Sequence, residues 1–538
     1  MKTKIWIGCA LLCGLITASC NDFLDEDAKG QLDPKNYYAS QEELDMNVYA
    51  LYQKVMKTQG YTNMQLPQWM GDDMTANPGS NKQAAAEFDA FVPADNNKGV
   101  TECWQQHYVL IKAANKVIAY ASKTPTTDTE INIAVGQAKY WRAYSYFTLV
   151  RVFGPLPLRL EPAASTDDID YAAPVSSVED VYKQIVKDLT EAETTLPDDY
   201  STAPRKMFGA NTYITTQAVK ATLSAVYMAM AGWPLNKTEY YTLAAEKAKE
   251  VIDGVTNGKY EYILEQQFKH VYAMSHNYTN ETVVGINYVA DYGWDQDSQL
   301  TSSNLFESLG GWGDAWGEIR FWKNMPAGPR KNAIYNPKIL LGNKEGGQLV
   351  NWWEKDANGE NYIAEYHPMF SVYTVGKGNT DYDYTKPASQ DMTNDHRHRI
   401  IRYSEVLLWY AEAQARADGT PNDLAYQCIN KVRGRAGLAP LPAGMSGPDF
   451  ADAALTEHGW EVAGNWCALV TRRADQMRME LLQKTFEERK ANLPVEVAPG
   501  IFAQESVEIP EKATWQGEKS IYAPYPALDA SLNPALKR

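Results

Sequence analysis

The sequence predicts a mostly α-helical fold: a tetratricopeptide-like scaffold of helix pairs with a large irregular, aromatic-rich insertion that contains short strands. Three observations support this prediction. Apolar side chains recur at helical spacing over most of the chain outside 259–400. Two stretches, 217–254 and 403–437, each resemble a helical hairpin. Residues 259–400 instead hold clusters of glycine, asparagine, aspartate and aromatic residues without a sustained helical period.

The N-terminus predicts export and lipid attachment. Lys2 and Lys4 precede the apolar stretch 5–16, which is too short to span a bilayer, and small residues lead to Cys20. We interpret 1–19 as a lipoprotein signal peptide, with cleavage before Cys20 and acylation of that cysteine. Residues 20–36 then form an acidic tether, whose first acids are Asp22, Asp25, Glu26 and Asp27.

Composition excludes several classes of protein. The net charge of −16 disfavours nucleic acid, because an acidic surface repels phosphate backbones. Beyond the N-terminus only Cys103, Cys428 and Cys467 remain, and no CxxC pair occurs. This pattern indicates neither a zinc knuckle nor a disulfide framework, so we expect three buried packing thiols.

The predicted N-terminal scaffold covers 37–258, and the later helix pairs cover 401–490, followed by an extended tail, 491–538. Ser40 with Glu43 forms a capping-box pattern, and Ser177 with Asp180 suggests a second helix start. Each hairpin has one helix with i, i+3, i+4, i+7 spacing of mostly small residues, which permits close packing: Tyr241, Ala244, Ala245 and Ala248, then Ala425, Cys428, Ile429 and Val432. Trp104 and Trp141 lie on helix faces and are expected in the core.

Several segments resemble one family in order along nearly the whole chain. They are DFLD after Cys20, QAKYWRAYSYFTLVRVFGPLPL, SVEDVYKQIVKDLTEAETTLP, IIRYSEVLLWYAEAQAR with INKVRGRAGL, EHGWEVAGNWCALVTRRAD and YAPYPALDASLNPALKR. The chain resembles the SusD-like (RagB-like) nutrient-binding lipoproteins of the outer membrane. It departs from them at His458, where the family has a basic residue beside the glutamate, and in Asn465 to Ala468 and the final Lys537–Arg538.

The resemblance implies a function. Members of this family lie at the cell surface over a SusC-like TonB-dependent transporter, capture oligosaccharides and pass them on without hydrolysis. It implies no cofactor. The stretch 291–361 matches no fixed family pattern, so binding residues cannot be transferred by motif.

Candidate binding residues come from the chemistry of sugar recognition. Sugar rings stack on exposed aromatic faces, while their hydroxyls bond to polar side chains. Six of the fifteen tryptophans fall between 294 and 353, and a smaller group precedes the second helix pattern. We therefore expect ligand contacts from Tyr292, Trp294, Trp312, Asp314, Trp316 and Trp353, and from Trp69 and Asp73. Of the adjacent Trp352 and Trp353, one is expected to face inward.

Other chemistries remain open. Two carboxylates could form a glycosidase pair, drawn from Asp291, Asp295, Asp297, Glu307, Asp314 and Glu318. A non-glycan nutrient such as a peptide, or a helical adaptor that binds only proteins, is also possible. His396 and His398 alternate with arginines, which favours a polar strand over a metal site, and no metal is predicted.

Overall fold

The computed structural model describes residues 37–59, 66–69, 71–162, 173–290 and 296–537. The predicted signal peptide, Cys20, the tether, Tyr292 and Trp294 lie outside these ranges. Within them, no helix is both long enough and apolar enough to cross a membrane.

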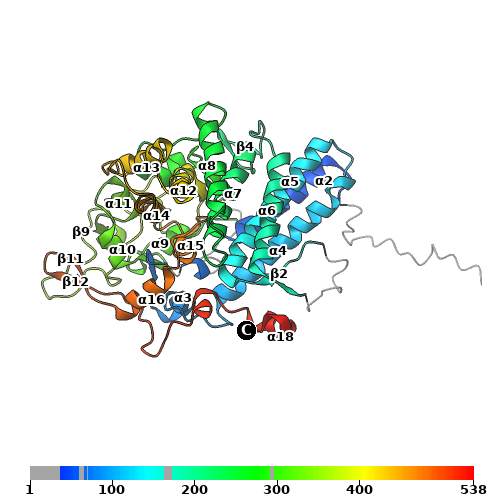
Figure 1. Cartoon of the computed structure of the whole chain (residues 1–538). Helices are drawn as coiled ribbons and strands as arrows, with labels where there is room; N and C mark the ends of the chain where they lie inside the picture. Colours follow the sequence, from blue (N-terminus) through cyan, green and yellow to red (C-terminus); the bar gives the residue numbers. More distant parts are fainter. Residues whose placement is uncertain (1–36, 60–65, 70, 163–172, 291–295, 538) are drawn as a thin grey trace, which may run out of the picture.

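The fold is mostly α-helical, as predicted, and its long helices form one continuous array (Figure 1). Each helix packs on the next, from α4 through α8, and α8 then packs on α12, which also contacts α13 and α14. The two predicted hairpins, α7–α8 and α12–α13, are therefore neighbours in space although the insertion separates them in sequence. The array comprises α2 (Gln41–Lys57), α4 (Lys98–Tyr120), α5 (Asp128–Phe153), α6 (Val178–Thr195), α7 (Thr216–Ala231), α8 (Tyr240–Thr256), α12 (Tyr403–Asp418), α13 (Asp423–Arg435) and α14 (Gly447–Val462).

Local sequence signals explain where these helices begin and how closely they pack. The Ser40 hydroxyl accepts from the Glu43 amide at 3.3 Å, and the Ser177 hydroxyl accepts from the Asp180 amide at 3.1 Å, so both predicted caps are confirmed. The Glu43 carboxylate, however, accepts from the Ala39 amide and not from that of Ser40. Small residues bring α7 and α8 so close that the Ser224 hydroxyl donates to the Ala244 carbonyl at 2.9 Å.

The other predicted core positions are also confirmed. Trp104 and Trp141 are buried, and so are the small residues on the inner faces of α8 and α13. Cys103, Cys428 and Cys467 are free and buried, and burial raises the pKa of the Cys103 thiol to about 12. These thiols are therefore inert packing groups at neutral pH.

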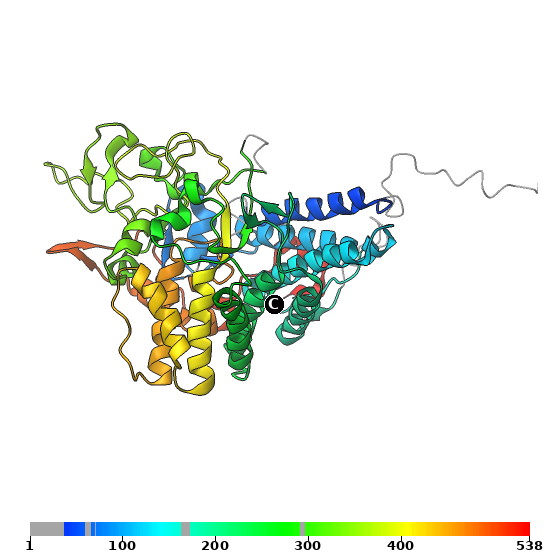
Figure 2. The ribbon, with the colours of Figure 1, turned by 90° about the horizontal axis from the view of Figure 1, so that it is seen from above.

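Residues 259–400 form a lobe of loops and short elements beside the helix array (Figure 2). The lobe has its own apolar core, which includes Phe306, Trp316, Ile339, Val350 and Trp352. Its helices are short: α9 (Leu300–Asn304), α10 (Ile319–Asn324) and α11 (Pro329–Ile334). The predicted strand near Thr282 is confirmed as β6 (Thr282–Ile286), which pairs antiparallel with β10 (His398–Arg402) and thereby joins the two ends of the lobe.

The remaining elements are short. The described strands pair antiparallel in twos: β1 (Met74–Ala76) with β7 (Ala315–Gly317), β2 (Leu156–Pro157) with β3 (Val175–Ser176), β4 (Lys206–Met207) with β5 (Ala210–Asn211), β8 (Ile339–Leu340) with β9 (Leu349–Val350), and β11 (Val495–Ala498) with β12 (Ile501–Ala503). The other helices are α3 (Gln83–Asp89), α15 (Arg472–Arg478), α16 (Leu482–Ala491), α17 (Glu518–Ile521) and α18 (Ala527–Leu532).

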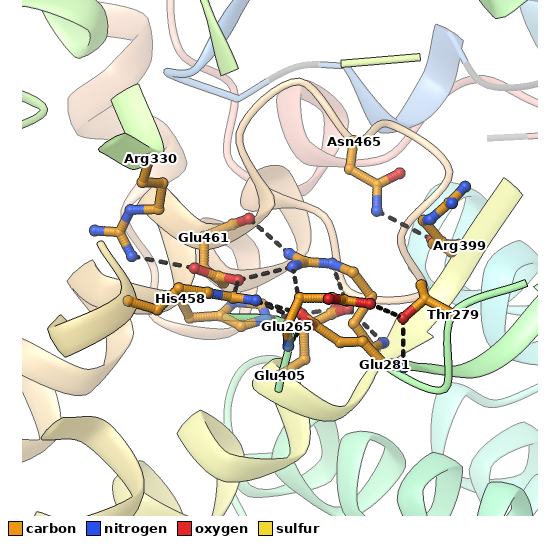
Figure 3. Close-up of polar contacts among 11 residues, drawn as sticks. Glu265, Thr279, Glu281, Arg330, Arg399, Glu405, His458, Glu461 and Asn465 are labelled. Atoms are coloured by element: carbon orange, nitrogen blue, oxygen red, sulfur yellow. Dashed lines mark hydrogen bonds and ion pairs between the residues drawn. The ribbon is translucent and has the colours of Figure 1, made fainter. Parts of the chain in front are cut away.

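A buried ion-pair network joins the lobe to the helix array (Figure 3). Arg402 of β10 donates to Glu461 of α14 at 2.7 Å, and Arg435 of α13 donates to Glu281 at 2.7 Å and also pairs with Glu461. Arg330 of the lobe donates to Glu461 at 3.2 Å. Burial alone would raise the pKa of Glu461, but these three guanidinium groups outweigh it and lower that pKa to about 2.

We expect Glu461→Ala to lower the free energy of unfolding by about 3–5 kcal/mol, because it leaves buried arginines short of a partner. The loss should be present at pH 7 and should shrink as the pH falls towards 2, where Glu461 of the parent chain becomes protonated. Urea unfolding followed by circular dichroism measures both effects. Asp253→Ala, which breaks the exposed Lys249–Asp253 pair, is the matched control and should cost less than about 1 kcal/mol. Equal losses in the two variants would contradict the structural role of the network.

Candidate ligand-binding site

A short two-stranded sheet brings together the two groups of predicted binding residues. β1 pairs with β7, and Thr75 lies opposite Trp316. The Glu318 amide donates to the Asp73 carbonyl at 3.2 Å, and the Asn77 amide donates to the Asp314 carbonyl at 3.3 Å. The Trp69–Asp73 segment and the Trp312–Trp316 segment, far apart in sequence, therefore belong to one region.

The loop that carries Trp312 is fixed by backbone hydrogen bonds to α9. The Trp312 amide donates to the Ser302 carbonyl at 2.6 Å, and the Asp314 amide donates to the Ser303 carbonyl at 2.8 Å. Gly310 and Gly313 have φ angles of 91° and 57°, a backbone conformation that favours glycine. Trp312 itself is partly exposed on this hydrogen-bonded loop.

Asp314 has a different role from the predicted one. Its side chain is buried, and its carboxylate accepts from the Ser303 hydroxyl at 2.8 Å and pairs with the Lys82 ammonium. The expectation that Asp314 faces a ligand is therefore wrong in this structure. The carboxylate anchors the Trp312 loop to the segment before α3.

Trp316 and Trp69 are also buried, with exposed fractions of 4% and 2%. Trp316 packs edge-on against Phe306, with ring centroids 5.9 Å apart, and Trp69 stacks on Trp466 at 4.8 Å. The prediction that these two rings stack on a ligand is wrong, because neither has a free face. Trp69 follows a short 3₁₀ turn and Trp316 lies on the short strand β7, and both are covered by long-range contacts that the local sequence does not reveal.

Asp73 is buried as well, which corrects its predicted role as an exposed ligand contact. Burial and the neighbouring Asp72 carboxylate raise the pKa of Asp73 to about 7. Asp72 pairs with Arg472 at 2.7 Å. The Asp73 carboxyl therefore lies in the protein interior, where it cannot face a ligand in solvent.

Trp353 belongs to a separate aromatic group. Trp353 and Trp322 are half-exposed, and Trp352 is buried, as the alternation of the pair predicts. The three ring centroids lie 5.2–5.4 Å apart. The Lys331 ammonium lies 4.2 Å from the centre of the Trp322 ring, and burial lowers its pKa to about 8. Trp353 and Trp322 thus present partly open aromatic surface.

A polar cleft of about 550 Å³ lies between the segments 343–345 and 376–391. The Gln390 side chain, on its wall, donates to the Leu309 carbonyl at 2.9 Å, so the cleft borders the Trp312 loop. Its charged lining is mixed: Lys344, Lys377, Lys386, Glu345, Asp381, Asp383 and Asp391. The cleft was not predicted from the sequence, although the run of turn-forming and acidic residues at 376–386 is a signal for it.

The residues considered for other chemistries are mostly buried. Asp297, Asp314 and Glu318 are buried, and the Glu318 carboxylate caps α10 at the Phe321 amide. Glu307 is exposed, while Asp291 and Asp295 lie outside the described residues. β10 begins at His398, so the predicted strand is confirmed from that residue on, whereas His396 precedes the strand; both rings are buried.

Comparison with known protein families matches both halves of the chain. Residues 22–228 match a family described as "Starch-binding associating with outer membrane", and residues 342–538 match the SusD family. A SusD-like protein, P2, from Formosa agariphila is 24% identical over 439 residues, which cover 79% of this chain and 80% of that protein.

Solved structures share the fold. A crystal structure described with a xylogluco-oligosaccharide has a TM-score of 0.71 and 19% identity, and covers 92% of this chain and 98% of that one. A laminarin-binding SusD-like protein has a TM-score of 0.68 and 19% identity, with 92% and 98% covered.

The two tryptophans of the loop should differ sharply in their effect on stability. We expect Trp316→Ala to reduce the free energy of unfolding by about 3–5 kcal/mol, because it opens a cavity in the core of the lobe. Trp312→Ala should cost clearly less than Trp316→Ala, since the Trp312 side chain is partly exposed and leaves a smaller cavity. Denaturant unfolding measures both. A large loss in Trp312→Ala would mean that this ring is a packing residue.

Proposed function

Since this chain belongs to the SusD family, we propose that it is a cell-surface lipoprotein that binds glycans and delivers them to a SusC-like TonB-dependent outer-membrane transporter. On this proposal the protein captures its ligand and does not hydrolyse it. Relatives of the same fold support a glycan ligand, since one is described with a xylogluco-oligosaccharide and another as laminarin-binding.

The observation that carries the proposal is the partly exposed Trp312 on a hydrogen-bonded loop beside a polar cleft. A sugar ring can stack its C–H face on the indole, while its hydroxyls bond to carboxylates, ammonium groups and amides of the cleft wall. A loop fixed before binding loses little conformational entropy when the ligand arrives. We propose Trp353 as a second contact with the glycan. Tyr292 and Trp294 lie outside the described residues and remain predicted contacts.

The charge of the cleft argues for a neutral oligosaccharide. Lysines and acids alternate along its lining, so no single sign dominates locally. The net charge of the whole chain is −16, which repels polyanions at long range. A neutral ligand avoids this repulsion and can still use both kinds of side chain as hydrogen-bond partners.

Membrane attachment through Cys20 is the second part of the proposal. Cys20→Ala should abolish incorporation of a radiolabelled fatty acid and release the chain from the membrane fraction, because the acylated thiol is the only proposed anchor. Cys103→Ala is the control and should leave labelling unchanged, since that thiol is buried. Labelling that persists in Cys20→Ala would rule out this anchor.

Binding is tested by calorimetric titration of residues 21–538 against a panel of soluble neutral and acidic glycans. We expect one neutral class to bind with a dissociation constant of about 10 μM to 1 mM, as is typical of flat aromatic platforms. Trp312→Ala should weaken binding about tenfold or more through loss of stacking. Tyr49→Ala, which removes an exposed ring from α2, is the matched control and should bind like the parent chain.

Reducing ends are assayed in the same samples. New reducing ends would overturn capture in favour of a hydrolase, with exposed Glu307 as the first carboxyl to test. Binding of peptides with no response to any glycan would replace the proposed ligand class. Equal glycan affinity in Trp312→Ala and the parent chain would show that the Trp312 ring does not contact the glycan.

A further inference from the structure

Two histidines and a glutamate gather where the chain enters the lobe. Glu265, His270 and His276 each offer one ligand atom, and these three atoms lie within 4.8 Å of one another. We propose that they form a binding site for one divalent late transition-metal ion of the zinc class. No metal is predicted from the sequence, where only His396 and His398 suggest a metal pair, so this cluster is evident only in the folded chain.

The exposure of the histidines sets this pair apart. The chain has seven histidines, all within the described residues, and five are buried: His107, His367, His396, His398 and His458. Only His270 and His276 are partly exposed, and their rings stack with centroids 4.3 Å apart and planes inclined by 9°. An ion from solvent can therefore reach this pair, and two adjacent imidazoles supply two nitrogen donors.

A hydrogen-bond relay fixes the tautomer of His276. The Ser275 amide donates to one carboxylate oxygen of Asp381 at 2.7 Å, and the Ser275 hydroxyl donates to the other at 2.6 Å. The hydroxyl proton is therefore engaged, so the Ser275 oxygen accepts from His276 Nδ1 at 2.9 Å. Nδ1 carries the proton, and Nε2 keeps its lone pair for a metal. Histidine ligands in proteins are oriented in this way by a second hydrogen bond.

Glu265 is a pre-positioned oxygen ligand. Its side chain is largely buried, its amide donates to Glu281 at 2.7 Å, and the Thr279 hydroxyl donates to one of its carboxylate oxygens (Figure 3). Glu281 is itself held by Arg435 of the buried network. The carboxylate is thus fixed in place and supplies the negative charge that a divalent ion requires.

The donor set selects the ion. Two imidazoles and one carboxylate suit zinc and its neighbours, whereas calcium and magnesium prefer oxygen ligands. Zinc–nitrogen bonds of about 2.0–2.1 Å place tetrahedral ligand atoms roughly 3.3 Å apart. The stacked imidazole planes are nearly parallel, so binding requires the ligand atoms to close in and at least one ring to rotate until its nitrogen points at the ion, which partly exposed histidines can do. The fourth position remains for water.

The location suggests what the ion does. His270 lies in the 3₁₀ turn Phe268–Tyr272, whose Phe268 ring lies 5.0 Å from the Arg435 guanidinium, so this turn covers the buried network. Asp381, at the other end of the relay, lines the polar cleft. A bound ion would tie the turn to Glu265 and brace one wall of the cleft through Ser275.

The test uses the untagged chain after chelation and dialysis. Titration with ZnCl₂ should show saturable one-to-one binding and an increase in Tm, whereas CaCl₂ and MgCl₂ should not. His270→Gln and His276→Gln should each weaken zinc binding about 100-fold or more, and Ser275→Ala about tenfold through loss of the relay. Asp383→Asn, an exposed carboxylate of the same cleft outside the ligand set, is the control and should bind zinc like the parent chain.

Circular dichroism without metal confirms that each variant is folded. Cobalt gives a second readout, because its visible absorption reports tetrahedral nitrogen and oxygen ligands and should disappear in His270→Gln. Failure of the parent chain to bind zinc would overturn the proposal. Zinc binding that survives unchanged in a His270→Gln/His276→Gln double variant would also overturn it, since the ion would then lie elsewhere on the surface.

Discussion

The buried network of arginines and glutamates between the lobe and the helix array is the constraint on which the rest of the structure depends. Arg330 and Glu281 come from the lobe, Arg435 from α13 and Glu461 from α14. A charge left unpaired in such an interior costs several kcal/mol. The lobe therefore cannot swing away from α13 and α14 without exposing or stranding these groups. The network therefore fixes the irregular lobe, 259–400, relative to helices α13 and α14.

A fixed lobe gives the loops of the proposed binding site a rigid base. The loop of Trp312 is held by α9, by the β1–β7 pair and by the Lys82–Asp314 ion pair. Each of these contacts restrains backbone, and none of them uses the indole of Trp312. Buried Trp69 and Trp316 support the same region from below. Of the three predicted binding residues on this segment, Trp312 is partly exposed, whereas Asp314 and Trp316 are buried and support the loop.

The helices could be predicted from sequence because their signals are local. Ser40 and Ser177 mark helix starts, and small residues such as Ala244 mark close packing. The site could be predicted only as a region. Asp314 and Trp69 lie in polar, glycine-containing loops, but Lys82 and Trp466 cover them from distant parts of the chain. Such contacts depend on tertiary packing, which no local pattern encodes.

The histidine pair likewise depends on tertiary packing. His270 and His276 lie in two short 3₁₀ turns, so their spacing in sequence does not reveal that their rings stack. Glu265 reaches them only because Glu281 and Thr279 hold it in place, and Glu281 is held there by the network. The constraint that docks the lobe therefore also assembles this cluster. A substitution in the network should therefore displace the two histidines more than Trp312, because the loop of Trp312 is held through α9 and β7.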